Sequence, residues 1–377
     1  MNKKTLLPLS CLIAALTFTA CSDDDDNGFT DLGSKVEIPS GERVYVLNQG
    51  TWGMNNTSLT LFSPSTDATI ENLFKTQNGV MLGDNAQDMI ASDGNIYIAV
   101  NGSNYITRLN AAGVEQARMS FASTPDLQGG VRYIAADGGY IYATFYGGYI
   151  ARLDAKTLEI DRTLHTSAGN LEGLIVKDGK IYAANSWATV TDPVTQQTSY
   201  QYYTNLVVVD VKTFTEEKKG VTVAPNPNLI AEADGKVFVI SWGNYADRGN
   251  EFQTVNLADG TSTTITEAKD MAVGNGKVYL LKTQTDWATM TTQNEWLSYD
   301  IASGRLSTES FLKDAPDELA SEIIYMMDVD PTNGDIYIGV TYYASGNGDI
   351  YRFDRNGRFI STFDAGGQNP LKAVFLK

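Results

Sequence analysis

Short apolar runs with alternating apolar and polar positions recur along most of the chain. Seven of them contain a Tyr or Phe, most follow a tight turn such as Asp93-Gly94-Asn95, and each precedes a second apolar run within about twenty residues. Alternation of period two between turn residues predicts β-hairpins. The seven aromatic positions are Tyr45, Tyr97, Tyr142, Tyr182, Phe238, Tyr279 and Tyr337.

The spacing of these hairpins predicts the architecture. Successive aromatics lie 40 to 58 residues apart, a repeat length typical of a four-stranded propeller blade. The first repeat has no apolar strand ahead of residues 44–47, whereas the chain ends in an unpaired apolar run at 371–376. We therefore expect an all-β fold, a seven-bladed β-propeller of four-stranded antiparallel blades, closed by the C-terminal strand completing the first blade. Six or eight blades are the alternatives.

The first residues have the layout of a bacterial export signal. Lys3 and Lys4 precede an apolar stretch that ends at Ala20, which is too short for a stable membrane span. Thr19-Ala20-Cys21 resembles the lipobox of bacterial lipoproteins, although Phe18 replaces the usual aliphatic residue. This predicts a lipoprotein signal peptide at 1–20, a lipidated Cys21 with an acidic tether at 21–40, and the propeller at 41–377. The membrane would be reached through the lipid anchor only.

The acidic residues carry a further indication. Four Asp follow Ser22, and such a run is typical of a solvated tether. It also resembles the signal that directs lipoproteins of Bacteroidota to the outer face of the outer membrane, so we expect a cell-surface location. The formal net charge of −17 argues against a nucleic-acid partner. The two cysteines, Cys11 and Cys21, leave the mature domain without a disulfide.

The loops of one propeller face contain most of the tryptophans. In a four-stranded antiparallel blade, the loop between the second and third strands shares a face with the crossover to the next blade. Four of the five Trp fall in these second-to-third-strand loops, although large aromatics are scarce in exposed loops without a function. The loops are 48–57, 101–104, 145–148, 185–205, 241–250, 283–294 and 341–348. We expect an aromatic collar on this face.

Neutral amides accompany the collar aromatics, a combination that suits a neutral ligand with apolar faces and a hydrogen-bonding rim. Each aromatic could instead plug its loop onto the blade, and Asn also forms turns. The candidate ligand-binding residues are Asn48, Trp52, Asn101, Tyr146, Asn185, Trp187, Tyr202, Trp242, Tyr245, Trp287 and Tyr342.

Catalytic motifs are weak in this sequence. The only histidine, His165, lies in an outer strand, no phosphate-binding loop occurs, and residues 328–335 do not match a calcium-hand loop. We expect no catalytic residue, resident metal or cofactor. The enzymatic alternative is a metal-dependent lactonase-like hydrolase that uses acids and an amide near the channel. Its candidate ligands are Asp88, Glu172, Asn228, Asp270 and Glu322.

Several segments together resemble a known family. They are the Cys21-Ser-Asp-Asp tether, the Val-Tyr-Val-Leu-Asn-Gln-Gly run at 44–50, Asn-Thr-Ser-Leu at 56–59 and the repeated Asp-Gly-x-Ile-Tyr units. The chain resembles the YncE-like seven-bladed surface lipoproteins of Bacteroidota and is most similar to the BtuG-type proteins. The resemblance implies a non-enzymatic protein that binds cobalamin or a related corrinoid and delivers it to a TonB-dependent outer-membrane transporter. A glycan receptor and a scaffold for an outer-membrane complex are the alternatives.

Overall fold

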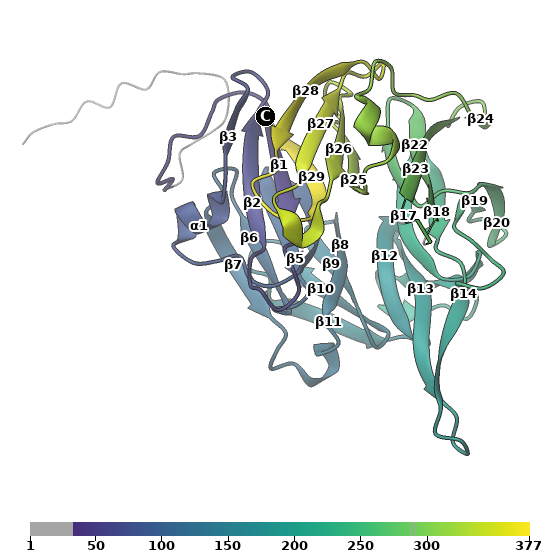
Figure 1. Ribbon diagram of the computed structural model, residues 1–377. Helices are drawn as coiled ribbons and strands as arrows, with labels where there is room; N and C mark the ends of the chain where they lie inside the picture. The colour runs from purple at the N-terminus through teal and green to yellow at the C-terminus, as the bar shows by residue number, and fades with distance from the viewer. Residues whose placement is uncertain (1–32, 287, 290) are drawn as a thin grey trace, which may run out of the picture.

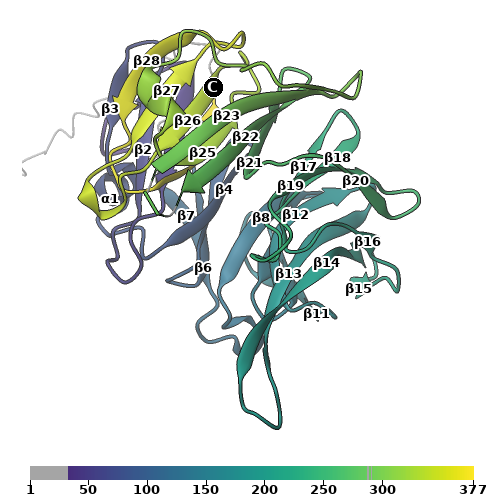
Figure 2. The ribbon, with the colours of Figure 1, turned by 45° about the vertical axis from the view of Figure 1, so that its right-hand side comes forward.

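The computed structural model describes residues 33–377 except 287 and 290, and it confirms the predicted seven-bladed propeller. Seven antiparallel sheets surround a central channel, and the innermost strand of each sheet contacts those of its two neighbours. Figure 1 and Figure 2 show this ring from two directions. The signal peptide, Cys21 and Trp287 lie outside the described residues. No described helix is long and apolar enough to cross a membrane.

The first three blades have the following strands, named from the channel outward. Blade one has β29 (Pro370–Leu376), β1 (Arg43–Asn48), β2 (Ser58–Ser63) and β3 (Ala68–Ile70). Blade two has β4 (Ala86–Ser92), β5 (Asn95–Val100), β6 (Tyr105–Leu109) and β7 (Glu115–Ser120). Blade three has β8 (Val131–Asp137), β9 (Tyr140–Phe145), β10 (Tyr149–Asp154) and β11 (Ile160–His165).

The other four blades repeat this order. Blade four has β12 (Asn170–Lys177), β13 (Lys180–Thr191), β14 (Thr198–Asp210) and β15 (Thr215–Glu216), with β16 (Val221–Thr222) also paired to β14. Blade five has β17 (Pro227–Ala233), β18 (Lys236–Ser241), β19 (Glu251–Asn256) and β20 (Thr261–Thr266). Blade six has β21 (Asp270–Gly274), β22 (Lys277–Asp286), β23 (Thr291–Asp300) and β24 (Arg305–Ser307). Blade seven has β25 (Ile324–Val329), β26 (Ile336–Val340), β27 (Asp349–Phe353) and β28 (Phe359–Asp364).

Among the described residues, the only helices are short and lie in the connections between strands. They are α1 (Leu73–Asn78), η1 (Pro125–Leu127), η2 (Asp317–Ala320) and η3 (Tyr343–Ser345). The apolar faces of the sheets pack against one another between neighbouring blades, and the core is a series of clusters around the ring.

The seven repeated aromatics lie on the second strand of each blade, as the hairpin pattern predicts. Their rings are buried, and some of their hydroxyls bridge blades. The Tyr45 hydroxyl donates to the carbonyl of Ala111 in blade two. The Tyr97 hydroxyl donates to the carbonyl of Ala155 in blade three, with an O···O distance of 2.8 Å. The repeat therefore has a physical cause, since each ring fills a blade interface, and in Tyr45 and Tyr97 the hydroxyl also ties the blade to the next one.

The C-terminal strand closes the ring inside blade one. Strand β29 pairs antiparallel with β1, and Val374 lies opposite Tyr45. Its other side faces blade seven, where Asp328 Oδ1 accepts from Lys372 Nζ at 2.7 Å and Asp328 Oδ2 accepts from the Ala373 N–H at 2.7 Å. The first blade is thus completed by the last residues of the chain, as predicted.

A pair of tyrosine variants should separate the inter-blade hydrogen bond from ring packing. Tyr97→Phe removes a hydroxyl that bonds across the interface and should cost about 1 kcal/mol of unfolding free energy. Tyr337→Phe is the matched control, because the buried Tyr337 hydroxyl has no hydrogen-bond partner among the described residues. Denaturant unfolding should therefore show no loss for Tyr337→Phe. Equal losses in both variants would contradict a role for the bridging bond.

Candidate functional site

One face of the ring carries all the second-to-third-strand loops together with the crossovers, and we call it the loop face. Backbone hydrogen bonds join the two sets. Gln49 N–H donates to Asn369 O at 2.9 Å, and Trp242 N–H donates to Asn226 O at 2.9 Å. A loop of one blade is therefore held by the crossover that enters the same blade.

Exposed large hydrophobic side chains gather on the loop face. Ten such residues are exposed in the described part of the chain. Three of them lie outside the second-to-third-strand connections, namely Phe359 and Ile360 on β28 and Val80 just after α1. Because soluble proteins rarely gather apolar side chains on one exposed surface without a partner, this concentration makes the loop face the candidate binding surface. The seven members on the loop face are Trp52, Met54, Val190, Val194, Tyr200, Tyr245 and Tyr343.

Two of these tyrosines have unusual backbone conformations. Tyr245 has a φ of 55° and Tyr343 a φ of 51°, in the left-handed region that bulky side chains rarely occupy. Each position therefore carries backbone strain, which is found most often at functional sites. Tyr245 is 73% exposed, so burial of its ring in the core does not compensate for that strain.

The longest wall of the loop face is a β-hairpin rather than the loop expected at 185–205. Strands β13 and β14 continue to pair beyond the blade, with Trp187 opposite Tyr202 and Val190 opposite Ser199. The alternation of side chains continues through this segment, so the ladder extends almost to the turn. Figure 2 shows the hairpin projecting well past the ring. Strands β22 and β23 extend blade six in the same way.

An aromatic row follows the base of this hairpin. The Tyr146 and Trp187 rings lie 5.7 Å apart at 72°, and the Trp187 and Tyr200 rings lie 5.5 Å apart at 79°. Tyr202 and Tyr245 form a second pair at 5.7 Å. Successive rings of the row stand nearly perpendicular, so they form a stepped cradle instead of one flat surface.

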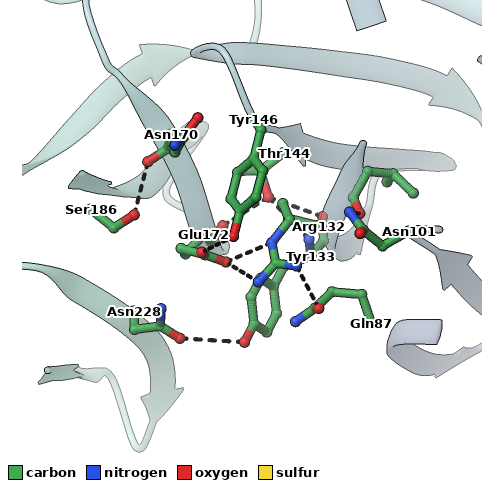
Figure 3. A network of polar contacts seen from close by, with 11 residues as sticks. Gln87, Asn101, Arg132, Tyr133, Thr144, Tyr146, Asn170, Glu172, Ser186 and Asn228 are labelled. Atoms are coloured by element: carbon green, nitrogen blue, oxygen red, sulfur yellow. Dashed lines mark hydrogen bonds and ion pairs between the residues drawn. The ribbon is translucent and has the colours of Figure 1, made fainter. Parts of the chain in front are cut away.

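A polar network lies where the channel opens onto the loop face (Figure 3). Arg132 is central to it: its Nε and Nη2 donate to Glu172 Oε2 at 2.9 and 2.8 Å, and its Nη1 donates to Gln87 Oε1 at 2.6 Å. Glu172 Oε1 accepts from the Tyr146 hydroxyl at 3.0 Å. The guanidinium carbon also lies 4.5 Å from the centre of the Tyr146 ring. The network thus connects the channel directly to the aromatic row.

The network has no net charge, which favours a neutral ligand over a charged one. Burial raises the pKa of Glu172, and the charge of Arg132 acts against that rise. Both charges are taken from water, and their mutual attraction compensates for much of the desolvation. The neighbouring polar side chains are uncharged and buried: they are Gln87 and Asn228, and the Asn228 Oδ1 lies 3.5 Å from the Tyr133 hydroxyl.

Further into the channel, three carboxylates surround one lysine. Lys372 pairs with Asp328, and Asp88 and Asp270 lie close enough to interact with both. Burial raises the pKa of Asp88 and of Asp270 to about 6. Burial also raises the pKa of Asp328, although the charge of Lys372 acts against it. This cluster holds the inner strands together at an electrostatic cost.

The geometry needed by the metal-dependent alternative is not found among the described residues, which contain no group of three His, Cys, Asp or Glu side chains arranged to hold a metal. Glu172 binds Arg132, and both Asp88 oxygens accept backbone N–H groups, from Met89 at 2.9 Å and Ile134 at 2.9 Å. These carboxylates are engaged within the fold.

Three predicted amides hold loops in place. Asn48 is fully buried, and its Nδ2 donates to Ala365 O at 2.7 Å. Asn185 is also buried, and its Oδ1 accepts from the Gly169 N–H at 3.0 Å. Asn101 Nδ2 donates to Val131 O at 2.9 Å. Asn48 and Asn185 were predicted to face a ligand, and the structure buries both amides: Asn48 against the crossover from blade seven, and Asn185 against the crossover that enters its own blade.

The predicted aromatics all lie on the loop face as far as the structure describes them. Trp52 and Tyr245 are strongly exposed, whereas Tyr146, Trp187, Tyr202, Trp242 and Tyr342 are partly buried. Trp242 Nε1 donates to Lys269 O at 3.4 Å, and the Tyr342 hydroxyl donates to Asp349 at 2.9 Å.

Sequence reasoning missed the residues of the channel mouth. Arg132, Gln87 and Tyr325 were not among the candidates, and the Tyr325 hydroxyl donates to Gln49 Oε1 at 2.5 Å. A signal was present, because each of them comes shortly before the apolar part of an innermost strand. These residues come together only because the ring of blades closes, and the residue pattern along a single strand does not reveal that contact.

A family model described as "Domain of unknown function (DUF5074)" matches residues 42–375. No curated protein sequence matches the chain. Among solved structures, a "quinonprotein alcohol dehydrogenase-like protein" from Bacteroides thetaiotaomicron has a TM-score of 0.63 at 15% identity, with 88% of this chain and 77% of that chain covered. The Pan2 WD40 domain of Neurospora crassa has a TM-score of 0.52 at 8% identity, with 73% and 78% covered. At these identities the likeness shows the propeller fold alone.

Substitution of Asp88 should change how stability depends on pH. An unfolded Asp titrates near pH 4, whereas folded Asp88 titrates near pH 6. The folded state therefore binds more protons between these values, and stability contributed by this group falls as pH rises through them. In Asp88→Asn this dependence disappears, so the variant should gain about 1–2 kcal/mol relative to wild type between about pH 4 and pH 7.

Denaturant unfolding at several pH values measures this difference. Asp126→Asn is the control, since it removes an exposed carboxylate on η1. Parallel pH profiles for Asp88→Asn and wild type would show that the buried carboxylate is not proton-linked to folding.

Proposed function

The chain belongs to the DUF5074 family, and we propose that this member captures cobalamin or a related corrinoid on its loop face and passes it to a TonB-dependent outer-membrane transporter. The observation that carries this proposal is the gathering of seven exposed hydrophobic side chains on one face, beside a polar network with no net charge. We propose a binding function without catalysis.

The chemistry of a corrinoid suits these two features. A corrin ring has broad apolar surfaces and a rim of amide groups. Aromatic side chains such as Trp187 and Tyr200 would pack against the apolar surfaces, while the partly exposed amides of Asn101 and Asn170 beside the polar network would meet the rim. Because Arg132 is already neutralised by Glu172, the ligand has no need to supply a matching net charge.

The shape of the aromatic row favours a thick ligand over a flat one. Tyr146, Trp187 and Tyr200 meet edge to face, so they enclose a volume from more than one side. A sugar receptor more often presents one open aromatic platform. Trp52, which is 67% exposed, is the feature that favours the competing glycan-binding function.

Location is proposed from the start of the chain. The lipobox-like segment at Cys21 and the acidic run behind it support a lipid-anchored protein on the outer surface of the outer membrane. An anchored protein reaches a transporter in the same membrane without leaving it. The exposed apolar side chains of blades one and seven, Trp52, Met54 and Tyr343, offer contacts to such a partner.

Corrinoid capture can be tested with cyanocobalamin, whose visible absorbance reports binding directly. The chain lacking residues 1–21 is mixed with the pigment and separated on a sizing column. We expect stoichiometric co-elution, and Trp187→Ala or Tyr200→Ala should weaken binding about five- to thirtyfold, because each removes an aromatic contact worth about 1–2 kcal/mol.

Ile360→Ala is the matched control, as it truncates an exposed hydrophobic side chain on β28. It should co-elute with pigment as wild type does. Absence of co-elution at micromolar concentrations would remove the corrinoid proposal, and a glycan array would then test the competing function.

A further inference from the structure

A cavity lies between blades six and seven, remote from the aromatic row. Its volume is about 240 Å³, and it is bounded by β23, the crossover after β24 and the turn after β27. Strand β27 runs away from the loop face, so the turn at 354–358 lies at the opposite end of the blade. Whatever binds here would not compete for the loop face.

One wall of this cavity forms where the backbone of the crossover lies very close to the backbone of the turn at 354–358. The Lys313 N–H donates to Gly357 O at 2.6 Å, which holds the crossover against the turn. A Cβ on Gly357 would lie 1.8 Å from Phe311 O, and its φ is +79°. Only glycine allows the crossover this close, so the cavity is built by two blades together.

Three cationic side chains line the cavity, namely Lys277, Lys313 and Arg355. Among the ion pairs of the described residues, none involves any of these three. Glu309 is the one acid that lines the same cavity. In a chain with a net charge of −17, three unpaired cations around one cavity form a local positive site.

Two hydroxyl groups in the cavity have protons free to donate. Tyr279 accepts a hydrogen bond from Asn275 Nδ2 at 3.0 Å, and no described acceptor takes its own proton. The side-chain hydroxyl of Ser298, a residue only 7% exposed, forms no hydrogen bond with described residues. Burial raises the pKa of Tyr279 and the charge of Arg355 acts against it, so the phenol stays protonated and faces a cation.

From this arrangement, we propose that the cavity binds a small ligand bearing a phosphate or carboxylate group, with Lys277 and Arg355 pairing with the oxyanion and the Tyr279 and Ser298 hydroxyls donating to its oxygens. Charge-assisted hydrogen bonds from several donors are the usual means of holding such groups. A cavity of this volume accommodates a ligand of about the size of a phosphorylated sugar, below the usual range for drug-sized ligands.

Isothermal titration calorimetry of the chain lacking residues 1–21 tests the site, with glucose 6-phosphate, inorganic phosphate, glucuronate and glucose as probes. We expect at least one anionic probe to bind and glucose to give no heat. Lys277→Met/Arg355→Met should weaken binding at least about tenfold. Glu309→Gln should strengthen it, because it removes the one repelling carboxylate, an effect that a merely structural role would not produce.

Lys156→Met/Lys218→Met is the matched control, since it removes two charges from exposed lysines elsewhere. It should bind as wild type does. Preference among the probes identifies whether phosphate or carboxylate is the ligand group. Equal weakening by the control, or no heat from any anionic probe at low ionic strength, would overturn the proposal. Cobalamin binding is measured separately, so either result leaves the function of the loop face unaffected.

Discussion

The pairing of β29 with β1 is the constraint on which the rest of the structure depends. It joins the two ends of the propeller, more than 300 residues apart in sequence, into one sheet. Without it, β1 would present an unpaired edge, and the facing sides of blades one and seven would be only partly covered. With it, the innermost strands form a closed ring, so the channel and both faces of the molecule have fixed geometry.

Closure also explains why polar groups converge at the channel. Arg132, Glu172 and Gln87 come from three different blades, yet they form one hydrogen-bonded unit. Lys372 approaches Asp328 only because the last strand enters the first blade. These buried charges reduce stability unless they are matched. Their pairing therefore fixes the position of each innermost strand relative to its neighbours.

The connections on the loop face differ in length and structure from blade to blade. Most second-to-third-strand loops are short and tied to a crossover by backbone hydrogen bonds. Blades four and six extend the strands themselves, and β13 and β14 carry Trp187 and Tyr200 beyond the ring. A strand ladder holds aromatic rings more firmly than a loop would, which reduces the entropy lost on binding. The strained tyrosines at 245 and 343 add contacts at the rim of the same face.

Much of the fold was readable from local pattern. Alternation, turn residues and the seven aromatics sufficed for blade number, strand order and closure, because each depends on short-range hydrophobic periodicity. The same pattern located the aromatic collar, since strand parity decides which loops share a face. Local pattern could not separate Asn48 and Asn185, which are buried and hydrogen-bonded to crossover backbone, from amides open to solvent.

The sequence by itself thus determined the propeller, its closing strand and the face that carries the aromatics. Only the tertiary structure decided which side chains meet. The neutral mouth around Arg132 and the cationic cavity around Arg355 each combine residues from separate blades. Their chemistry depends on distances across blade interfaces, and no periodicity within one strand encodes these distances.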